Sequence, residues 1–93
     1  MMSYRNQVHI VSDVLFAVKD GHQDGIGIAQ LMRKANLSYI RATKIIAELV
    51  GVGLIEEIKM EKFTKFKITP AGLEYLDVYK DFSEFAKNFG LTI

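Results

Sequence analysis

The chain has 93 residues, enough for one domain with a modest core. Hydrophobic residues make up 49% of it, an ordinary share for a globular protein, which argues against disorder. Cysteine is absent, which excludes disulfides, thiolate catalysis and cysteine-ligated zinc and suits a reducing cytoplasm. No apolar run is long enough to cross a bilayer, and Asp13 interrupts the N-terminal segment before any signal-like cleavage site. We therefore expect neither a membrane span nor an export signal.

The net charge of +1 is unevenly distributed along the chain. Residues 33–67 hold eight basic and four acidic residues, a net charge of +4, whereas residues 74–93 hold two basic and four acidic residues, a net charge of −2. Local charge matters more than the total, because one face of a protein contacts phosphates. The basic stretch is a candidate nucleic-acid-binding surface, although lysines that only solvate a surface would give the same pattern.

A first helix is predicted over residues 4–20, with Ser3 as its N-cap. Apolar residues at three- and four-residue steps define its buried face: Val8, Val11, Val14, Leu15 and Val18. Gly21, His22, Asp24 and Gly25 end the helix. Ile26 is predicted to form a strand of one or two residues that pairs with a later hairpin.

Two further helices follow, joined by a tight turn over residues 36–38. The shorter covers residues 28–35 and buries Ile28, Leu31 and Met32, with Arg33 and Lys34 at the end where cations are favourable. The longer covers residues 38–50, begins at the N-cap Ser38 and ends at Gly51 and Gly53.

Helical spacing divides the longer helix into two faces. The face predicted to meet the core carries Tyr39, Ala42, Ile46, Leu49 and Val50. The outward face carries Ile40, Arg41, Lys44 and Ala47, with Thr43 beside them.

A two-stranded hairpin comes next, with its turn near residues 61–63. Alternate positions predict one apolar face made of Leu54, Ile58, Met60, Phe66 and Ile68. The opposite face is predicted to carry Lys59, Lys65 and Lys67.

Thr69 and Pro70 mark the start of a last helix, a hydroxyl cap followed by proline at the first helical position, which ends near Asn88. Five of its residues follow heptad-like steps of three and four: Tyr75, Val78, Phe82, Phe85 and Phe89. A helix of this length extends about 30 Å, more than the small domain can cover. We expect a second copy of the chain to pack on this surface, although it could instead form the wall of a pocket.

In this order the elements form a helix-turn-helix followed by a wing, a mainly α fold with a small β-hairpin (α+β) and a long C-terminal helix. The turn Ala35-Asn36-Leu37-Ser38-Tyr39, the exit from Leu49 to Glu56, and Thr69, Gly72 and Leu76 resemble the winged-helix superfamily. More closely, they resemble small archaeal winged-helix DNA-binding proteins that dimerise through an antiparallel coiled coil of C-terminal helices. The resemblance implies a winged helix-turn-helix domain over residues 1–69 and a dimerisation helix over residues 70–93, in a single domain overall.

The outward face of the helix over residues 38–50 is the candidate base-reading surface. Arg41 and Lys44 lie one turn apart there, and arginine can bind guanine O6 and N7 with about 1–3 kcal/mol of discrimination. Lys44 could instead pair with Glu48. Ile40 could contact a thymine methyl group or be buried by packing within the protein.

Phosphate contacts are expected at the start of that helix and at the wing. Ser38 and Tyr39 can offer hydroxyls beside the helix N-terminus, although Tyr39 could equally belong to the core. Lys62 and Lys65 flank the tip of the wing over residues 59–67. The predicted DNA-binding set is Ser38, Tyr39, Arg41, Thr43, Lys44, Lys62 and Lys65.

No constellation in the sequence predicts catalysis. His9 and His22 lack a spaced partner ligand for a metal, and Glu56 and Glu57 are predicted to lie on opposite strand faces. Residues 25–27 lack the third glycine of a phosphate-binding loop. We therefore expect no enzyme activity, no cofactor or metal, and no small-molecule substrate.

The function predicted from the sequence is a homodimeric DNA-binding transcriptional regulator, in the cytoplasm with the nucleoid. Its modest charge favours selected sites over coating of a genome. An alternative is a winged-helix protein-interaction module without DNA binding, which the acidic last helix favours. A third option is a ligand-gated regulator with a pocket at the dimer seam.

Overall fold

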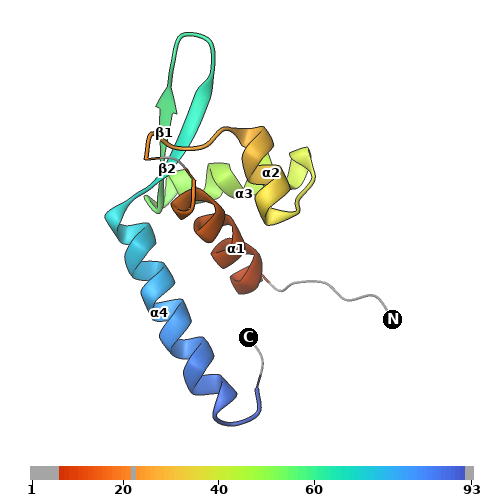
Figure 1. Ribbon diagram of the computed structural model, residues 1–93, viewed down its shortest axis with the longest axis vertical. Helices are drawn as coiled ribbons and strands as arrows, with labels where there is room; N and C mark the ends of the chain where they lie inside the picture. Colours follow the sequence, from red (N-terminus) through yellow and green to blue (C-terminus); the bar gives the residue numbers. More distant parts are fainter. Residues whose placement is uncertain (1–6, 22, 92–93) are drawn as a thin grey trace.

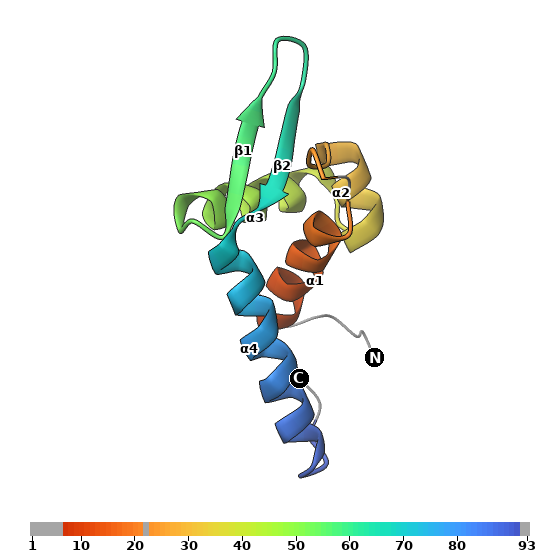
Figure 2. The same ribbon diagram turned by 60° about the vertical axis from the view of Figure 1, so that its left-hand side comes forward.

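The computed structural model describes residues 7–21 and 23–91. The elements are α1 (Gln7–Lys19), α2 (Ile28–Ala35), α3 (Tyr39–Gly51), β1 (Ile55–Lys59), β2 (Thr64–Ile68) and α4 (Pro70–Lys87). This is the predicted winged helix-turn-helix, mainly helical with one small antiparallel sheet. In both ribbon views the first three helices form a body, the hairpin projects from one end of it, and α4 extends from the other (Figures 1 and 2).

The core lies where α1, α2 and α3 meet the base of the hairpin. Leu15, Leu31 and Ile55 are among its fully buried side chains, and Leu76 joins α4 to the same cluster. Val14, Leu15 and Val18 are buried as predicted, but Val8 is exposed because the buried stripe of α1 begins at Ile10. The predicted Ser3 cap and His22 lie outside the described residues.

The turn between α2 and α3 is set by local backbone chemistry. Asn36 adopts the left-handed conformation, with φ 56°, which asparagine tolerates better than most residues. Leu37 then donates its backbone N–H to Met32 O at 3.0 Å and buries its side chain. The Ser38 hydroxyl oxygen accepts a hydrogen bond from Arg41 N at 3.3 Å, which confirms the predicted N-cap of α3.

The two faces of α3 lie largely as predicted. Ala42, Ile46 and Leu49 are buried, and Ile45 joins them. Tyr39 is the exception: its side chain is 60% exposed, so the prediction of a core position was wrong. It occupies the first residue of α3, and helical side chains tilt toward the N-terminus, so this side chain extends past the end of the core.

The hairpin register corrects the predicted strand faces. Ile55 pairs with Ile68, Glu57 with Phe66, and Lys59 with Thr64. Directly paired residues share a face, so Lys59 lies on the side of Phe66, whereas Lys65 and Lys67 lie on the other. The prediction placed Leu54, Ile58 and Met60 on the core face. The observed core face of β1 is shifted by one residue from that prediction, so every side chain of β1 lies on the face opposite to the one predicted.

The shift arises because Leu54 still belongs to the exit from α3. Its backbone N–H donates to Leu49 O at 2.9 Å and its carbonyl accepts from Thr69 N at 3.2 Å, so the strand begins only at Ile55. Ile26 does form the predicted short strand contact, exchanging two backbone hydrogen bonds of 2.8 and 2.9 Å with Phe66.

Thr69 fixes the start of α4 and ties it to the end of α3. Its hydroxyl oxygen accepts from Gly72 N at 3.1 Å, the predicted cap, while the hydroxyl proton is donated to Gly53 O at 2.7 Å. Pro70 follows at the first helical position. From this start α4 packs against α1 and β2, and Leu76 is its deepest side chain in the core.

Gly72 lies so close to the exit from α3 that an added Cβ would overlap the carbonyl oxygen of Leu54 and lie 2.6 Å from Ile68 Cγ1. We expect Gly72→Ala to lower the free energy of unfolding by about 1–3 kcal/mol, because this overlap outweighs the better helix propensity of alanine. Urea unfolding measures the change. Gly51→Ala is the matched control, since a Cβ at Gly51 meets nothing within 4 Å and should be neutral or stabilising. Equal stability of both variants would contradict the close packing.

Candidate nucleic-acid interface

The outward face of α3 is open to solvent over its whole length. Arg41 and Lys44 are exposed one turn apart, and Ile40 beside them is 78% exposed, so it does not pack away. Within residues 7–21 and 23–91, no carboxylate lies within 4.0 Å of either cation, so the alternative pair of Lys44 with Glu48 is not formed. These two charges are available to an external anion.

The hydroxyls near the start of α3 differ in what they can offer. Ser38 uses its oxygen as the cap acceptor, which leaves its proton for a phosphate. Thr43 donates its proton to Tyr39 O at 2.9 Å and to Ile40 O at 3.0 Å, so its hydroxyl is turned onto its own helix. Tyr39 is exposed, and its side chain lines the same groove as Ile28 at the start of α2.

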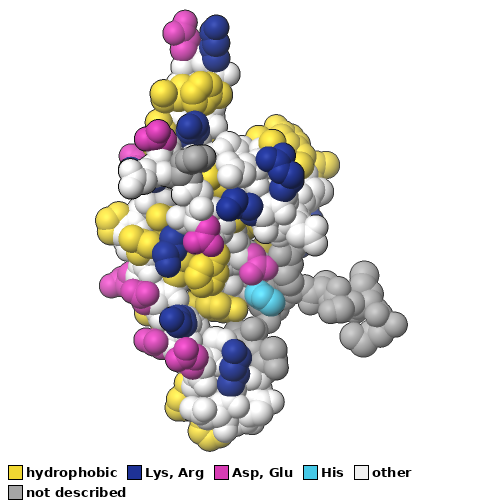
Figure 3. Space-filling model, viewed as in Figure 1, with side chains coloured by type: hydrophobic (Ala, Val, Ile, Leu, Met, Phe, Trp, Pro, Cys, Tyr) yellow, Lys and Arg dark blue, Asp and Glu magenta, His cyan; other side chains and the backbone are white. Residues whose placement is uncertain are grey.

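Lys62 is exposed at the tip of the hairpin. Lys65 is half-buried, and its Nζ lies 5.6 Å from the centroid of the Phe63 ring, within cation–π range. The turn is closed by a hydrogen bond from Met60 N to Phe63 O of 2.8 Å, at the predicted place. In the space-filling view, hydrophobic atoms lie directly below an acidic and a basic side chain at the extremity of the hairpin (Figure 3).

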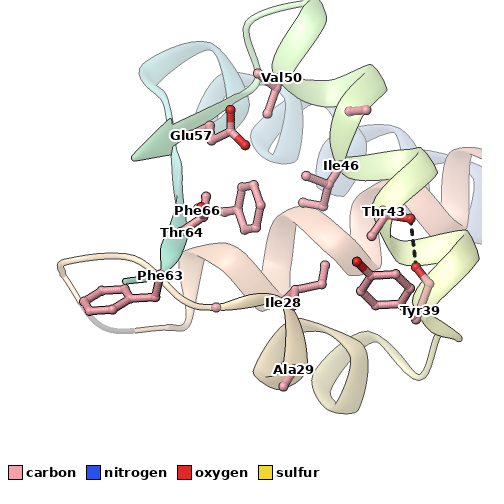
Figure 4. A pocket seen from close by; sticks show the side chains of 12 residues that line it. Ile28, Ala29, Tyr39, Thr43, Ile46, Val50, Glu57, Phe63, Thr64 and Phe66 are labelled. Carbon is pink, nitrogen blue, oxygen red and sulfur yellow. Dashed lines mark hydrogen bonds between the residues drawn. The ribbon is translucent and has the colours of Figure 1, made fainter. Parts of the chain in front are cut away.

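A groove of about 750 Å³ separates α3 from the hairpin and the start of α2. Tyr39, Thr43 and Ala47 line it from α3, and Glu57 and Phe66 line it from the strands. Figure 4 shows the Phe66 ring pointing across the groove toward Ile46. Sequence reasoning missed this groove because three separate elements form it; its one local signal is the four-residue spacing of Tyr39, Thr43 and Ala47 on α3.

The predicted heptad-like surface on α4 is apolar and open. Three of its members on α4 are between 53% and 62% exposed, namely Val78, Phe82 and Phe85, and Phe89, in the turn after the helix ends at Lys87, is 67% exposed. Tyr75, nearer the body, is half-buried; burial raises the pKa of its hydroxyl, and Tyr79 raises it further, so it stays neutral around pH 7. The lower half of α4 extends beyond α1 in both views (Figures 1 and 2).

No helix in the described part of the chain combines the length and apolar character that a membrane crossing needs. In the same residues, no three histidine, cysteine or acidic side chains are grouped to hold a metal ion.

A family model for winged helix-turn-helix proteins matches residues 4–87. The chain belongs to the winged helix-turn-helix family. Comparison of this winged helix-turn-helix protein with curated sequences finds no match.

Solved structures share the fold of this winged helix-turn-helix protein. Sso10a-2, a DNA-binding protein from Sulfolobus solfataricus, has a TM-score of 0.77 at 22% identity, over 91% of this chain and 85% of its own. MepR, a transcription regulator of the Staphylococcus aureus multidrug efflux pump MepA, has a TM-score of 0.73 at 13% identity, over 86% of this chain and 61% of its own. The type III plasmid segregation protein TubR has a TM-score of 0.62 at 15% identity, over 87% and 91%. At these identities the likeness shows the fold.

Proposed function

We propose that this winged helix-turn-helix protein binds duplex DNA as a homodimer and regulates transcription. The observation that carries the proposal is the exposed face of α3, where Arg41 and Lys44 stand without a carboxylate partner among the described residues. The family and the similarity to Sso10a-2 and MepR, a DNA-binding protein and a transcription regulator, support it. The proposal places the protein with the nucleoid in the cytoplasm.

In this proposal α3 enters the major groove, which is about 12 Å wide and admits one helix. Arg41 and Lys44 reach base edges, while Ser38, Tyr39 and the free N–H groups at the start of α3 face a phosphate. Lys62 and Lys65 bind the backbone beside the groove. Glu57 in the groove between α3 and the hairpin would repel phosphate, so the DNA lies against the outward face of α3 and not inside that groove.

The partner in the homodimer is a second copy packed on the apolar surface of α4. Several large apolar side chains in a row on one exposed helix face exceed what a monomer usually presents to water. The same stripe on two copies is self-complementary about a two-fold axis. Such a dimer would offer two α3 helices to one duplex, with half-sites separated by a helical turn of about 34 Å or a multiple of it.

Salt dependence tests the DNA-binding proposal. With two phosphate-binding cations contributed by each protomer (Lys62 and Lys65), a plot of log affinity against log salt should have a slope of about −4, because each phosphate contact adds about −0.9. Affinity for a duplex is measured by fluorescence anisotropy across salt concentrations. Lys80→Ala on α4, outside this set, should leave the slope unchanged. A flat plot would exclude phosphate contacts.

The second candidate is a protein-interaction module, favoured by the exposed phenylalanines of α4 and its acidic flanks. It predicts no retention on DNA even at low salt. The same anisotropy titration therefore separates the two functions.

A further inference from the structure

Two large apolar side chains are about half exposed to solvent at the tip of the hairpin. Met60 is 51% exposed and Phe63 is 50% exposed, and neither belongs to the hydrophobic core. Figure 4 shows the Phe63 ring at the edge of the groove, turned away from Phe66 and Ile46. The hairpin projects clear of the helical body in both ribbon views (Figures 1 and 2). Phe63 therefore lies outside the hydrophobic core and leaves half of its surface in water.

The Phe63 ring belongs to a lysine-rich segment of the chain. Residues 59–67 carry four lysines and one glutamate, a net charge of +3, and the Lys65 ammonium lies 5.6 Å from the centroid of the Phe63 ring. A partner must therefore combine negative charge with a surface that accepts a flat apolar ring. A duplex offers both, phosphates outside and stacked bases inside. A lipid surface also has both properties, but two apolar side chains are too few for stable membrane binding.

The length of the hairpin fits this partner. Five residues per strand at about 3.4 Å each make the paired strands about 17 Å long, with their base in the core, and half a turn of B-DNA is also about 17 Å. With α3 in the major groove, the tip of the hairpin can reach the adjacent minor groove. Apolar side chains that enter the minor groove act as wedges between base pairs.

We propose that Phe63 inserts between two base pairs from the minor groove, partly unstacks them and bends the duplex, with Lys62 and Lys65 binding the phosphates on either side. This rests on the proposed DNA binding and adds a residue and a mode of contact to it. Met60 extends the apolar surface against the sugars. Flexible steps such as TA and CA are the expected insertion points, because they open most easily.

The test uses the full chain and short duplexes that carry 2-aminopurine at a TA step, with a donor and an acceptor dye at the two ends. The wild-type protein should raise 2-aminopurine fluorescence and bring the ends closer. Phe63→Ala should weaken binding about tenfold and lose both signals, since one base–aromatic contact is removed. Phe63→Trp keeps a flat ring and should retain both. Val52→Ala removes another exposed apolar side chain, at the end of α3, and should behave as wild type.

Circular dichroism checks that the variants fold, which is expected because Phe63 lies outside the core. If the wild-type protein binds the duplex without unstacking or bending it, the wedge is wrong and DNA binding stands. If no variant retains DNA at low salt, the proposed function fails and the wedge with it. If Phe63→Ala loses binding to anionic vesicles but keeps the DNA signals, the tip is a lipid contact and the wedge is overturned.

Discussion

Replacement of Phe82 and Phe85 by aspartate is expected to leave the protein monomeric. Both rings are more than half exposed near the middle of the apolar surface on α4, so a second copy would bury them. Each substitution removes about 2–3 kcal/mol of stabilisation that burial of the ring gives the dimer. The new carboxylates would also face one another across the two-fold axis. The dimer dissociation constant should therefore rise more than about a thousandfold, the equivalent of about 4 kcal/mol. Light scattering at micromolar concentration measures the mass.

The same variant should also lose DNA affinity without any change at α3. Two linked recognition helices bind one duplex more tightly than one by about 10²–10⁴, because the second contact is intramolecular. Lys80→Asp is the control: it adds acid to the same helix away from the apolar surface, and should leave both mass and affinity unchanged. A wild-type monomer, or a double variant that remains dimeric, would show that α4 is not the interface.

The elements that could be predicted from sequence are those with local signals. α2 matches its predicted range of residues 28–35, and the caps at Ser38 and Thr69 form the expected hydrogen bonds. In each case the deciding contact joins residues within five positions of one another. Asn36 shows why this works, since a left-handed residue stops α2 without help from elsewhere in the fold.

The hairpin faces could not be predicted in the same way. Leu54 and Ile55 are adjacent and apolar, so alternation alone allows either to start the core-facing set. The choice is made by the hydrogen bond from Thr69 N to Leu54 O, between residues fifteen positions apart. The core position predicted for Tyr39 was wrong for a related reason. Periodicity assigns Tyr39 to the correct face of α3, but the core does not extend as far as its side chain.

The candidate site shows the same division. The exposed face of α3 follows from helical spacing, so Arg41 and Lys44 could be identified in advance. The groove between α3 and the hairpin, and the exposed Phe63 at the hairpin tip, depend on how three elements meet and where the turn closes. The four-residue spacing of Tyr39, Thr43 and Ala47 marks only the α3 side of the groove, and no spacing of residue types predicts the exposed Phe63.

Arg41→Ala is expected to change which DNA sequence the protein prefers. The Arg41 side chain takes no part in the fold: the cap of α3 uses only its backbone N–H, and the side chain is exposed. If the guanidinium binds one guanine bidentately, its loss removes about 1–3 kcal/mol of discrimination at that base pair in each half-site, or about 5- to 150-fold. Selection of bound sequences from a random duplex pool, with wild type and variant in parallel, measures the change.

Arg41→Lys separates the shape of the guanidinium from its charge. A lysine keeps the charge but not the planar fork, so preference at the guanine should fall while the dependence of affinity on salt stays the same. Lys44→Ala provides the comparison within the same face, one turn away. If Arg41→Ala instead weakens every sequence equally and makes the salt slope shallower by about 1, Arg41 holds a phosphate, and the bases are read by other residues of α3.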